Sequence, residues 1–274
     1  MTKAHGGFVW HELATTDLES AKAFYAHVVG WGAQDTPQAG FSYSLFTLPD
    51  GPVAGLMKLP EDAETRVAPH WLGYVAVDDV DLAVERLRRL GGAVYVPPAD
   101  ISGVSRFSIV ADPQQATFAL IQRLRTPLAP SAAPDAPGRV GWNELLAADW
   151  EQAFAFYNKL LGWQEMERRP GPMGVYQSFA AGAEMMGGMI DKPPTLPHPF
   201  WLYYFNVADI EAAAKRVEEA GGEILYGPDE APGAALIAHC ADAQGAAFAL
   251  MERRARKPVG YIVAPAPAAA GRRA

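Results

Sequence analysis

The chain of 274 residues lacks several features that mark secreted, membrane and nucleic-acid-binding proteins. Cys240 is its one cysteine, so an internal disulfide is excluded and a reducing cytoplasm is expected. No apolar run approaches the length of a membrane span, and the opening stretch MTKAHGGFVW has no signal-peptide pattern. Positive charge is scarce as well, since the formal net charge is −8. This balance argues against nucleic-acid and anionic-membrane partners.

The chain does contain a long internal repeat. WHELATTDLESAKAFYAHVVGW (10–31) aligns without a gap with WNELLAADWEQAFAFYNKLLGW (142–163), with identical residues at eleven of the twenty-two positions. Two further pairs follow in the same order: 71–92 with 201–222, and 112–122 with 242–252. Three collinear matches indicate a duplication. We expect copies at 7–123 and 139–253, a Pro- and Ala-rich linker at 124–138, and a tail at 254–274.

Hydrophobic periodicity predicts the elements of each copy. Residues 7–15 alternate like a strand, and a helix follows with Asp17 as N-cap and Gly30 at its end. Ranges 41–48 and 52–59 read as strands, and the order then repeats from residue 71. Each copy therefore consists of two βαβββ units. The prediction is an α+β fold with four such units.

Three motifs carry a resemblance to a known family: TDLESAKAFYAHVVGW with ADWEQAFAFYNKLLGW, the VDDVDLAVERLRRLGG helix, and DPQQATFALI with DAQGAAFALM. With them, nearly the whole of both copies resembles the vicinal oxygen chelate superfamily, which includes glyoxalase I, bleomycin-resistance proteins and extradiol dioxygenases. The resemblance implies two tandem glyoxalase-like domains with curved mixed sheets around clefts. It leaves the activity open, because one scaffold can carry unrelated chemistries.

The same resemblance locates the metal-ligand positions of metal-using members, which place His, Glu or Gln there. Counting from shared landmarks gives eight residues: Trp10, Gly55, Leu72, Ala119, Trp142, Gly187, Leu202 and Ala249. None of these side chains can donate a lone pair to a metal. We therefore expect no metal. No phosphate loop or dinucleotide fingerprint suggests another cofactor.

His11 and Glu12 stand side by side and could suggest a metal site. Strand alternation separates them, with Trp10, Glu12 and Ala14 on the cleft face and His11 on the opposite face, toward a covering helix. His11 is then a packed or surface histidine. The second copy has Asn143 at this position.

Glu12 and its counterpart Glu144 are the candidate catalytic residues. A carboxylate among apolar neighbours is costly unless it is hydrogen-bonded or protonated. Each could bind a ligand or act as a general base, or each could be a structural carboxylate. Tyr74 and Tyr204 share the cleft face and are candidate hydroxyl partners.

The predicted ligand-binding surface is mostly apolar, with Met57 and Met189 close by. It comprises Trp10, Leu72, Tyr74, Ala119, Trp142, Leu202, Tyr204 and Ala249. The first hypothesis is a metal-independent protein that binds a small apolar or aromatic molecule, as a monomeric pseudo-dimer or a homodimer. The second is a glyoxalase- or dioxygenase-like enzyme with an unusual metal site that draws on Glu12, Glu144, His70 or Glu252. The third is a metal-free enzyme with Glu12 or Glu144 as base.

Overall fold

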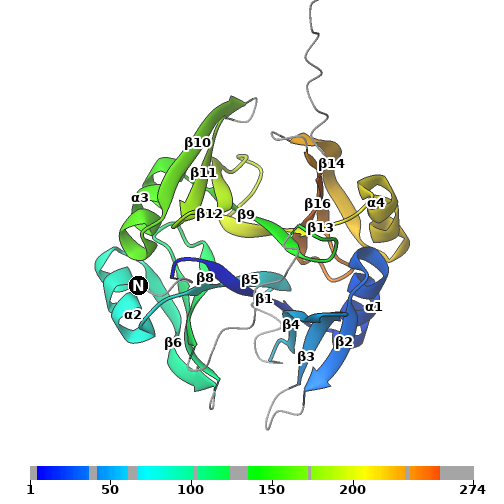
Figure 1. Cartoon of the computed structure of the whole chain (residues 1–274), viewed down its shortest axis with the longest axis horizontal. Helices are drawn as coiled ribbons and strands as arrows, with labels where there is room; N and C mark the ends of the chain where they lie inside the picture. The colour runs from blue at the N-terminus through cyan, green and yellow to red at the C-terminus, as the bar shows by residue number, and fades with distance from the viewer. Residues whose placement is uncertain are drawn as a thin grey trace, which may run out of the picture.

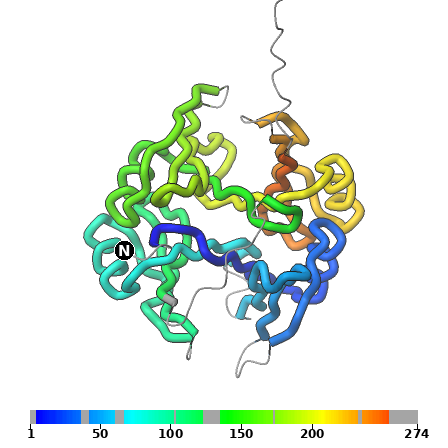
Figure 2. Tube along the Cα trace, viewed as in Figure 1, coloured from blue at the N-terminus to red at the C-terminus, as the bar shows by residue number. Residues whose placement is uncertain are grey.

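The computed structural model describes residues 5–36, 42–60, 67–101, 104–123, 135–171, 174–231 and 235–253, and Figure 2 marks these ranges along the chain trace. Most of the predicted linker and all of the predicted tail lie outside the described residues. The domain boundaries 7–123 and 139–253 therefore stay a prediction.

Each copy forms one eight-stranded sheet from two βαβββ units, which confirms the predicted fold class. The first copy contains β1 (Phe8–Thr15), α1 (Leu18–Val29), β2 (Gly32–Thr36), β3 (Tyr43–Leu48), β4 (Gly51–Lys58), β5 (His70–Ala76), α2 (Val80–Arg89), β6 (Ala93–Ile101), β7 (Ser105–Ala111) and β8 (Thr117–Arg123). The second contains β9 (Val140–Ala147), α3 (Trp150–Leu161), β10 (Gln164–Gly171), β11 (Gly174–Ala181), β12 (Glu184–Asp191), β13 (Phe200–Asn206), α4 (Ile210–Glu219), β14 (Glu223–Ala231), β15 (Ala235–Ala241) and β16 (Ala247–Arg253). The strand orders are β2-β3-β4-β1-β5-β8-β7-β6 and β10-β11-β12-β9-β13-β16-β15-β14.

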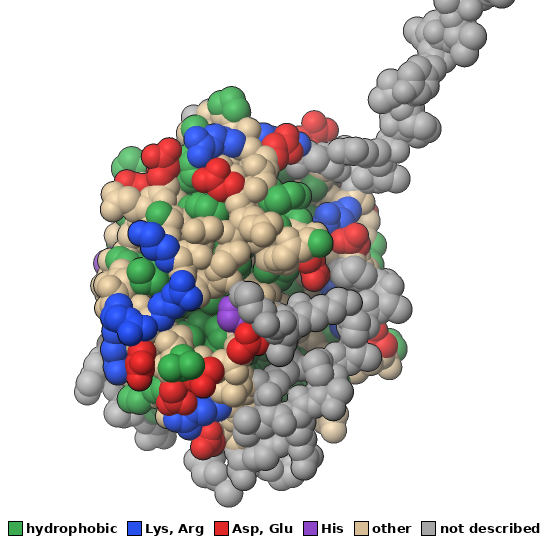
Figure 3. Space-filling model, turned by 60° about the vertical axis from the view of Figure 1, so that its left-hand side comes forward, with side chains coloured by type: hydrophobic (Ala, Val, Ile, Leu, Met, Phe, Trp, Pro, Cys, Tyr) green, Lys and Arg blue, Asp and Glu red, His purple; other side chains and the backbone are tan. Residues whose placement is uncertain are grey.

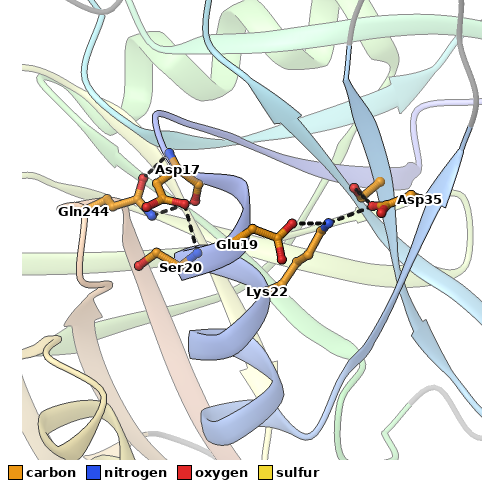
Figure 4. Close-up of polar contacts among 7 residues, drawn as sticks. Asp17, Glu19, Ser20, Lys22, Asp35 and Gln244 are labelled. Carbon is orange, nitrogen blue, oxygen red and sulfur yellow. Dashed lines mark hydrogen bonds and ion pairs between the residues drawn. The ribbon is translucent and has the colours of Figure 1, made fainter.

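Helix α1 begins where its N-cap satisfies the free backbone N–H groups of the first turn. The Asp17 carboxylate accepts from the Ser20 N–H at 3.0 Å, and Gly30 ends the helix in the left-handed conformation, with φ of 83°. The other copy also contributes, because Gln244 Oε1 accepts from the Asp17 N–H at 2.8 Å (Figure 4). Gln114 makes the reciprocal contact with Asp149 of the second copy, at 3.0 Å.

The main hydrophobic core lies between the two copies and is shared by them. In Figure 1, β1 and β5 lie against β9 and β13 at the centre, α1 lies beside α4, and α2 lies beside α3. The Tyr25 hydroxyl of α1 donates to Asp242 of the second copy at 3.1 Å, and Tyr157 of α3 donates to Asp112 of the first copy at 3.1 Å. These buried reciprocal bonds fix one copy against the other.

The arms of each sheet point away from the other sheet in Figure 1. We call the face of each sheet that packs on the shared core its outer face. The opposite face, which is turned away from the shared core, is its inner face. Among the described residues, none of the helices is long and apolar enough to cross a membrane. Acidic and basic side chains are interspersed over the face drawn in Figure 3.

Candidate functional site: a buried carboxylate on each inner face

The inner face of each sheet carries a small hydrophobic cluster separate from the main core. The first is formed by Leu72, Tyr74, Ala119 and Ile121, with Val9, Trp10, Phe107 and Ile109 packed against it. The second is formed by Leu202, Tyr204, Ala249 and Met251, with Trp142, Phe200, Ala235, Ile237 and Ala247 packed against it. The structure thus brings together, four to a face, all eight residues of the predicted ligand-binding surface.

On the first inner face, Glu12 lies between two tyrosines. Only 7% of this residue is exposed. The Tyr74 hydroxyl donates to Glu12 Oε1 at 2.9 Å, and Tyr43 on β3 also bonds the carboxylate. Trp10 Nε1 donates in turn to the Tyr43 hydroxyl at 3.3 Å. We call Trp10, Glu12, Tyr43 and Tyr74 the first carboxylate cluster.

The second inner face repeats this arrangement. Glu144, also 7% exposed, accepts from the Tyr176 hydroxyl at 3.1 Å and bonds Tyr204 as well. Trp142 Nε1 donates to the Tyr176 hydroxyl at 2.6 Å. We call Trp142, Glu144, Tyr176 and Tyr204 the second carboxylate cluster.

Burial sets the protonation chemistry of both carboxyls. Burial raises the pKa of Glu12 above its usual range, and the hydrogen bonds from Tyr43 and Tyr74 oppose that rise. Burial raises the pKa of Glu144 to about 7, against opposing bonds from Tyr176 and Tyr204. A carboxyl group that titrates near neutrality can donate a hydrogen bond when protonated and accept a proton when ionised.

The second cluster has a histidine that the first lacks. The Tyr204 hydroxyl lies 2.9 Å from His239 Nε2 on β15. Burial lowers the pKa of His239 to about 4, so its ring is neutral at pH 7. In the first copy Ile109 occupies the equivalent place, because Ile109 pairs with Ala119 as His239 pairs with Ala249.

The inner faces do not fit a metal ion at the β4 ligand position that the resemblance implies, or at its equivalent in β12. In β4, a side chain at Gly55 would begin 2.1 Å from the Tyr43 hydroxyl, so the tyrosine fills that space. In the second copy the residue paired with Glu144 is Gly188, not Gly187 as counted from the sequence. A side chain there would meet the Tyr176 ring at 2.3 Å. Within the described ranges, no group of three His, Cys, Asp or Glu residues could hold a metal.

Counting from the sequence placed Met189 on the wrong face by the same error of one residue. It faces the main core and is fully buried, whereas its neighbour Ile190 takes the place that Met57 has in the first copy. Alternation along a strand has a period of two, so an error of one residue exchanges the faces.

His11 is packed, but it faces the other copy and not a helix. Its Nε2 lies 2.9 Å from Asn143 Oδ1 across the seam, and burial lowers its pKa to about 4. The pair borders a hollow of about 380 Å³ between the copies. Phe8, Trp142, Met185, Met186 and Arg253 are among its other lining residues.

The remaining candidates for an unusual metal site have other contacts. His70 Nδ1 lies 2.9 Å from the Ala68 carbonyl oxygen. Glu252 accepts from the Ile210 N–H at 2.9 Å, at the start of α4. The structure does not join either residue to a carboxylate cluster.

Sequence reasoning missed Tyr43, Tyr176 and His239. Both tyrosines stand at the same place in the equivalent hairpins of the two copies, FSYSLF and GVYQSF, and an alignment of those strands reveals them. His239 has no histidine counterpart in the first copy, so the repeat does not point to it. That difference itself marks the position where the two inner faces diverge.

The family model described as Glyoxalase/Bleomycin resistance protein/Dioxygenase superfamily matches residues 7–120 and 139–250. The chain belongs to this superfamily. It is 34% identical over 246 residues to a putative glyoxylase CFP32 of Mycobacterium bovis, covering 89% of this chain and 93% of that protein. It is 29% identical over 283 residues to the anthracycline biosynthesis protein DnrV of Streptomyces peucetius, covering 98% of each chain.

Solved structures share the fold at low identity. A Mn(II)-bound glyoxalase from Novosphingobium aromaticivorans superposes with a TM-score of 0.63 at 15% identity, covering 91% of this chain and 82% of that one. The 2,3-dioxygenase LapB from Pseudomonas sp. KL28 superposes with a TM-score of 0.64 at 12% identity, covering 95% and 96%. At these identities the likeness supports the fold and not the activity.

Proposed function

We propose that the chain binds a small aromatic or largely apolar molecule on an inner face of its sheets, without a metal, and holds it through a buried carboxylate. The carboxylate–tyrosine cluster that occurs in both copies carries this proposal. A buried carboxyl with a raised pKa is costly to maintain, and such groups concentrate at functional sites. The alternative is that both carboxylates are structural.

The chemistry of the surroundings defines the ligand class. Half-buried Trp10 and Trp142 offer flat apolar surfaces beside the carboxylates. An aromatic body with a hydroxyl or amine donor would match an apolar wall next to an acceptor. The whole-length relative named for anthracycline biosynthesis supports a small-molecule ligand.

Metal independence rests on the chemistry of the donor positions. Gly, Ala, Leu and Trp stand where metal-using members place ligands, and the hydroxyls of Tyr43 and Tyr176 lie beside those positions.

A second candidate function is a metal-free enzyme with a glutamate base. The pKa of about 7 at Glu144 favours it, because a general base works best when its pKa is near the operating pH. From the sequence we also propose a cytoplasmic location, and a chain that is either a monomeric pseudo-dimer or a homodimer.

Calorimetric titration of the full chain with 4-nitrophenol and with aniline tests the binding proposal. We expect saturable binding to at least one inner face. Glu12→Gln or Glu144→Gln should weaken the better site by about 1–3 kcal/mol, the range for a hydrogen bond to a buried charge. Glu223→Gln, at an exposed position on β14, is the matched control. Unchanged affinities with lowered stability would identify the carboxylates as structural.

A further inference from the structure

The two inner faces differ in how their carboxylates connect to solvent. Glu144 and Tyr204 are both buried, at 7% and 1% exposure, whereas His239 is half-buried. Tyr204 bonds Glu144 on one side and lies 2.9 Å from His239 Nε2 on the other. A continuous path of hydrogen-bonding groups therefore leads from the carboxylate to a ring near the surface.

We propose that the second inner face is an acid–base site for aromatic molecules with an acidic proton, in which Glu144 takes the proton and Tyr204 and His239 pass it to solvent. This inference rests on the proposed function, because the molecule must first bind beside Glu144. It goes further by assigning the chemistry to one copy and by naming the proton path.

The path needs no further reactant. The Glu144 carboxylate removes a proton from the bound molecule, whose bonding electron pair stays behind as the anion. The Tyr204 hydroxyl then turns from Glu144 toward His239 Nε2, which can accept a proton in the tautomer that carries the ring proton on Nδ1. The protonated carboxyl donates to the Tyr204 oxygen while the Tyr204 proton moves to Nε2. The imidazolium releases a proton to water, and rotation of the groups restores the starting arrangement.

The groups around His239 allow its ring to accept a proton and release it again. Tyr204 faces it from β13 and Tyr226 pairs with it from β14, with ring centroids 5.4 Å apart, while Ala249 pairs with it from β16. The Tyr226 hydroxyl donates to Asp229 at 2.7 Å, so a carboxylate lies at the outer end. Since burial lowers the pKa of His239 to about 4, the ring gives up a proton readily and does not retain it.

The first inner face provides the comparison built into the chain. Glu12 has the same two tyrosine contacts, but Ile109 stands in place of His239 and Val96 in place of Tyr226. Tyr74 therefore faces apolar side chains where Tyr204 faces a histidine. The first face has the carboxylate without this path.

Proton removal can be tested with 5-nitrobenzisoxazole, a flat aromatic compound. A base takes its ring C–H proton, the C–H electron pair forms the nitrile, and the N–O bond breaks to leave a coloured phenolate. We expect the full chain to accelerate this reaction with an apparent pKa near 7, as burial sets it for Glu144. Glu144→Gln should lower the rate about a hundredfold, the low end for general-base catalysis. Equal losses in Glu12→Gln and Glu144→Gln would overturn the assignment to the second copy.

The path is tested by proton exchange at Glu144, followed by NMR of carboxyl-labelled glutamate near pH 7. In the unmodified chain we expect one sharp, exchange-averaged resonance. His239→Ile, which installs the first copy's residue, and Tyr204→Phe should both broaden or split it, and added imidazole should restore it in His239→Ile. Tyr176→Phe also removes a Glu144 contact but lies off the path, so its resonance should stay averaged. Fast exchange in His239→Ile would overturn the path.

The two proposals fail in different ways. One outcome is that 4-nitrophenol binds but Glu144→Gln does not change the rate of the 5-nitrobenzisoxazole reaction. This outcome would reject the acid–base site and leave the binding function. Loss of all small-molecule binding would reject both. Melting curves of each variant ensure that unfolding is not mistaken for either result.

Discussion

Each inner face has a carboxylate between two tyrosines, and the two faces differ in the residue next to one of those tyrosines. This residue is Ile109 beside Tyr74 on the first face and His239 beside Tyr204 on the second. The duplication has therefore kept the costly buried carboxyl in both copies and changed its connection to solvent in one. The comparison indicates that the cluster supports a property common to both copies, and that any acid–base chemistry belongs to the second.

The largest expected effect is on the pH dependence of stability. The pKa of Glu144 is raised from 4.5 to about 7 in the folded state. Its contribution to the free energy of unfolding is therefore fully present below pH 4.5 and is lost as pH rises through 7. The difference corresponds to about 3 kcal/mol. Glu144→Gln should gain about that much relative to the unmodified chain between about pH 4 and about pH 8, measured by urea unfolding.

Glu12→Gln is the paired variant for that measurement. Burial also raises the pKa of Glu12, so its relative stability should change in the same direction. A stability difference for Glu144→Gln that does not depend on pH would contradict the account of that carboxyl.

The next effect concerns the two glycines beside the tyrosines. An alanine at Gly188 would place Cβ 2.3 Å from two ring carbons and the hydroxyl oxygen of Tyr176, whereas at Gly55 the 2.1 Å contact is with the Tyr43 hydroxyl and the nearest ring carbon is 2.9 Å away. A side-chain end moves more easily than a whole ring. Thermal unfolding should therefore show a larger loss for Gly188→Ala than for Gly55→Ala, both in the range of about 1–3 kcal/mol for overpacking. The reverse order would mean that the second cluster is the looser one.

A third effect concerns the seam, where His11 opposes Asn143. The folded-state pKa of His11 is lowered from 6.5 to about 4, so its contribution is present above pH 6.5 and is lost as pH falls through 4. His11→Asn makes the two copies alike and removes this titration. We expect a cost of about 1 kcal/mol near neutral pH from the altered hydrogen bond, and a smaller loss of stability in mild acid. An unchanged acid dependence would show that His11 is accessible to protons when folded.

The smallest effect on stability is expected from exchanging the residues that distinguish the faces. His239→Ile and Ile109→His each replace one half-buried side chain by another, so we expect changes below about 1 kcal/mol. A larger loss in His239→Ile would mean that the contact with Tyr204 mainly supports the fold.

Most of the fold could be predicted from the sequence because its signals are local and repeated. Asp17 and Gly30 bound α1 as expected, and Tyr74 meets Glu12 because alternation places both on one face. The shared core was beyond such reasoning. Nothing local to His11 indicates that it faces Asn143 of the other copy.

Two errors at the site have one origin. The second copy has one more residue than the first before its hairpin, since Tyr43 follows Trp31 by 12 positions and Tyr176 follows Trp163 by 13. A single constant offset between the copies cannot account for that extra residue. Gly187 and Met189 were therefore each assigned to the wrong face. His239 carries no such repeated signal, because Ile109 stands at its place in the first copy.

We infer that the buried carboxyl of Glu144 changes its protonation near neutrality. Carbon NMR of carboxyl-labelled glutamate across the pH range tests it most directly. The account predicts a glutamate resonance that titrates near pH 7, as burial sets it, and that disappears in Glu144→Gln. If the resonance lost in Glu144→Gln instead titrates at the ordinary value of an exposed glutamate, the carboxyl is not held in an apolar site and the account is wrong.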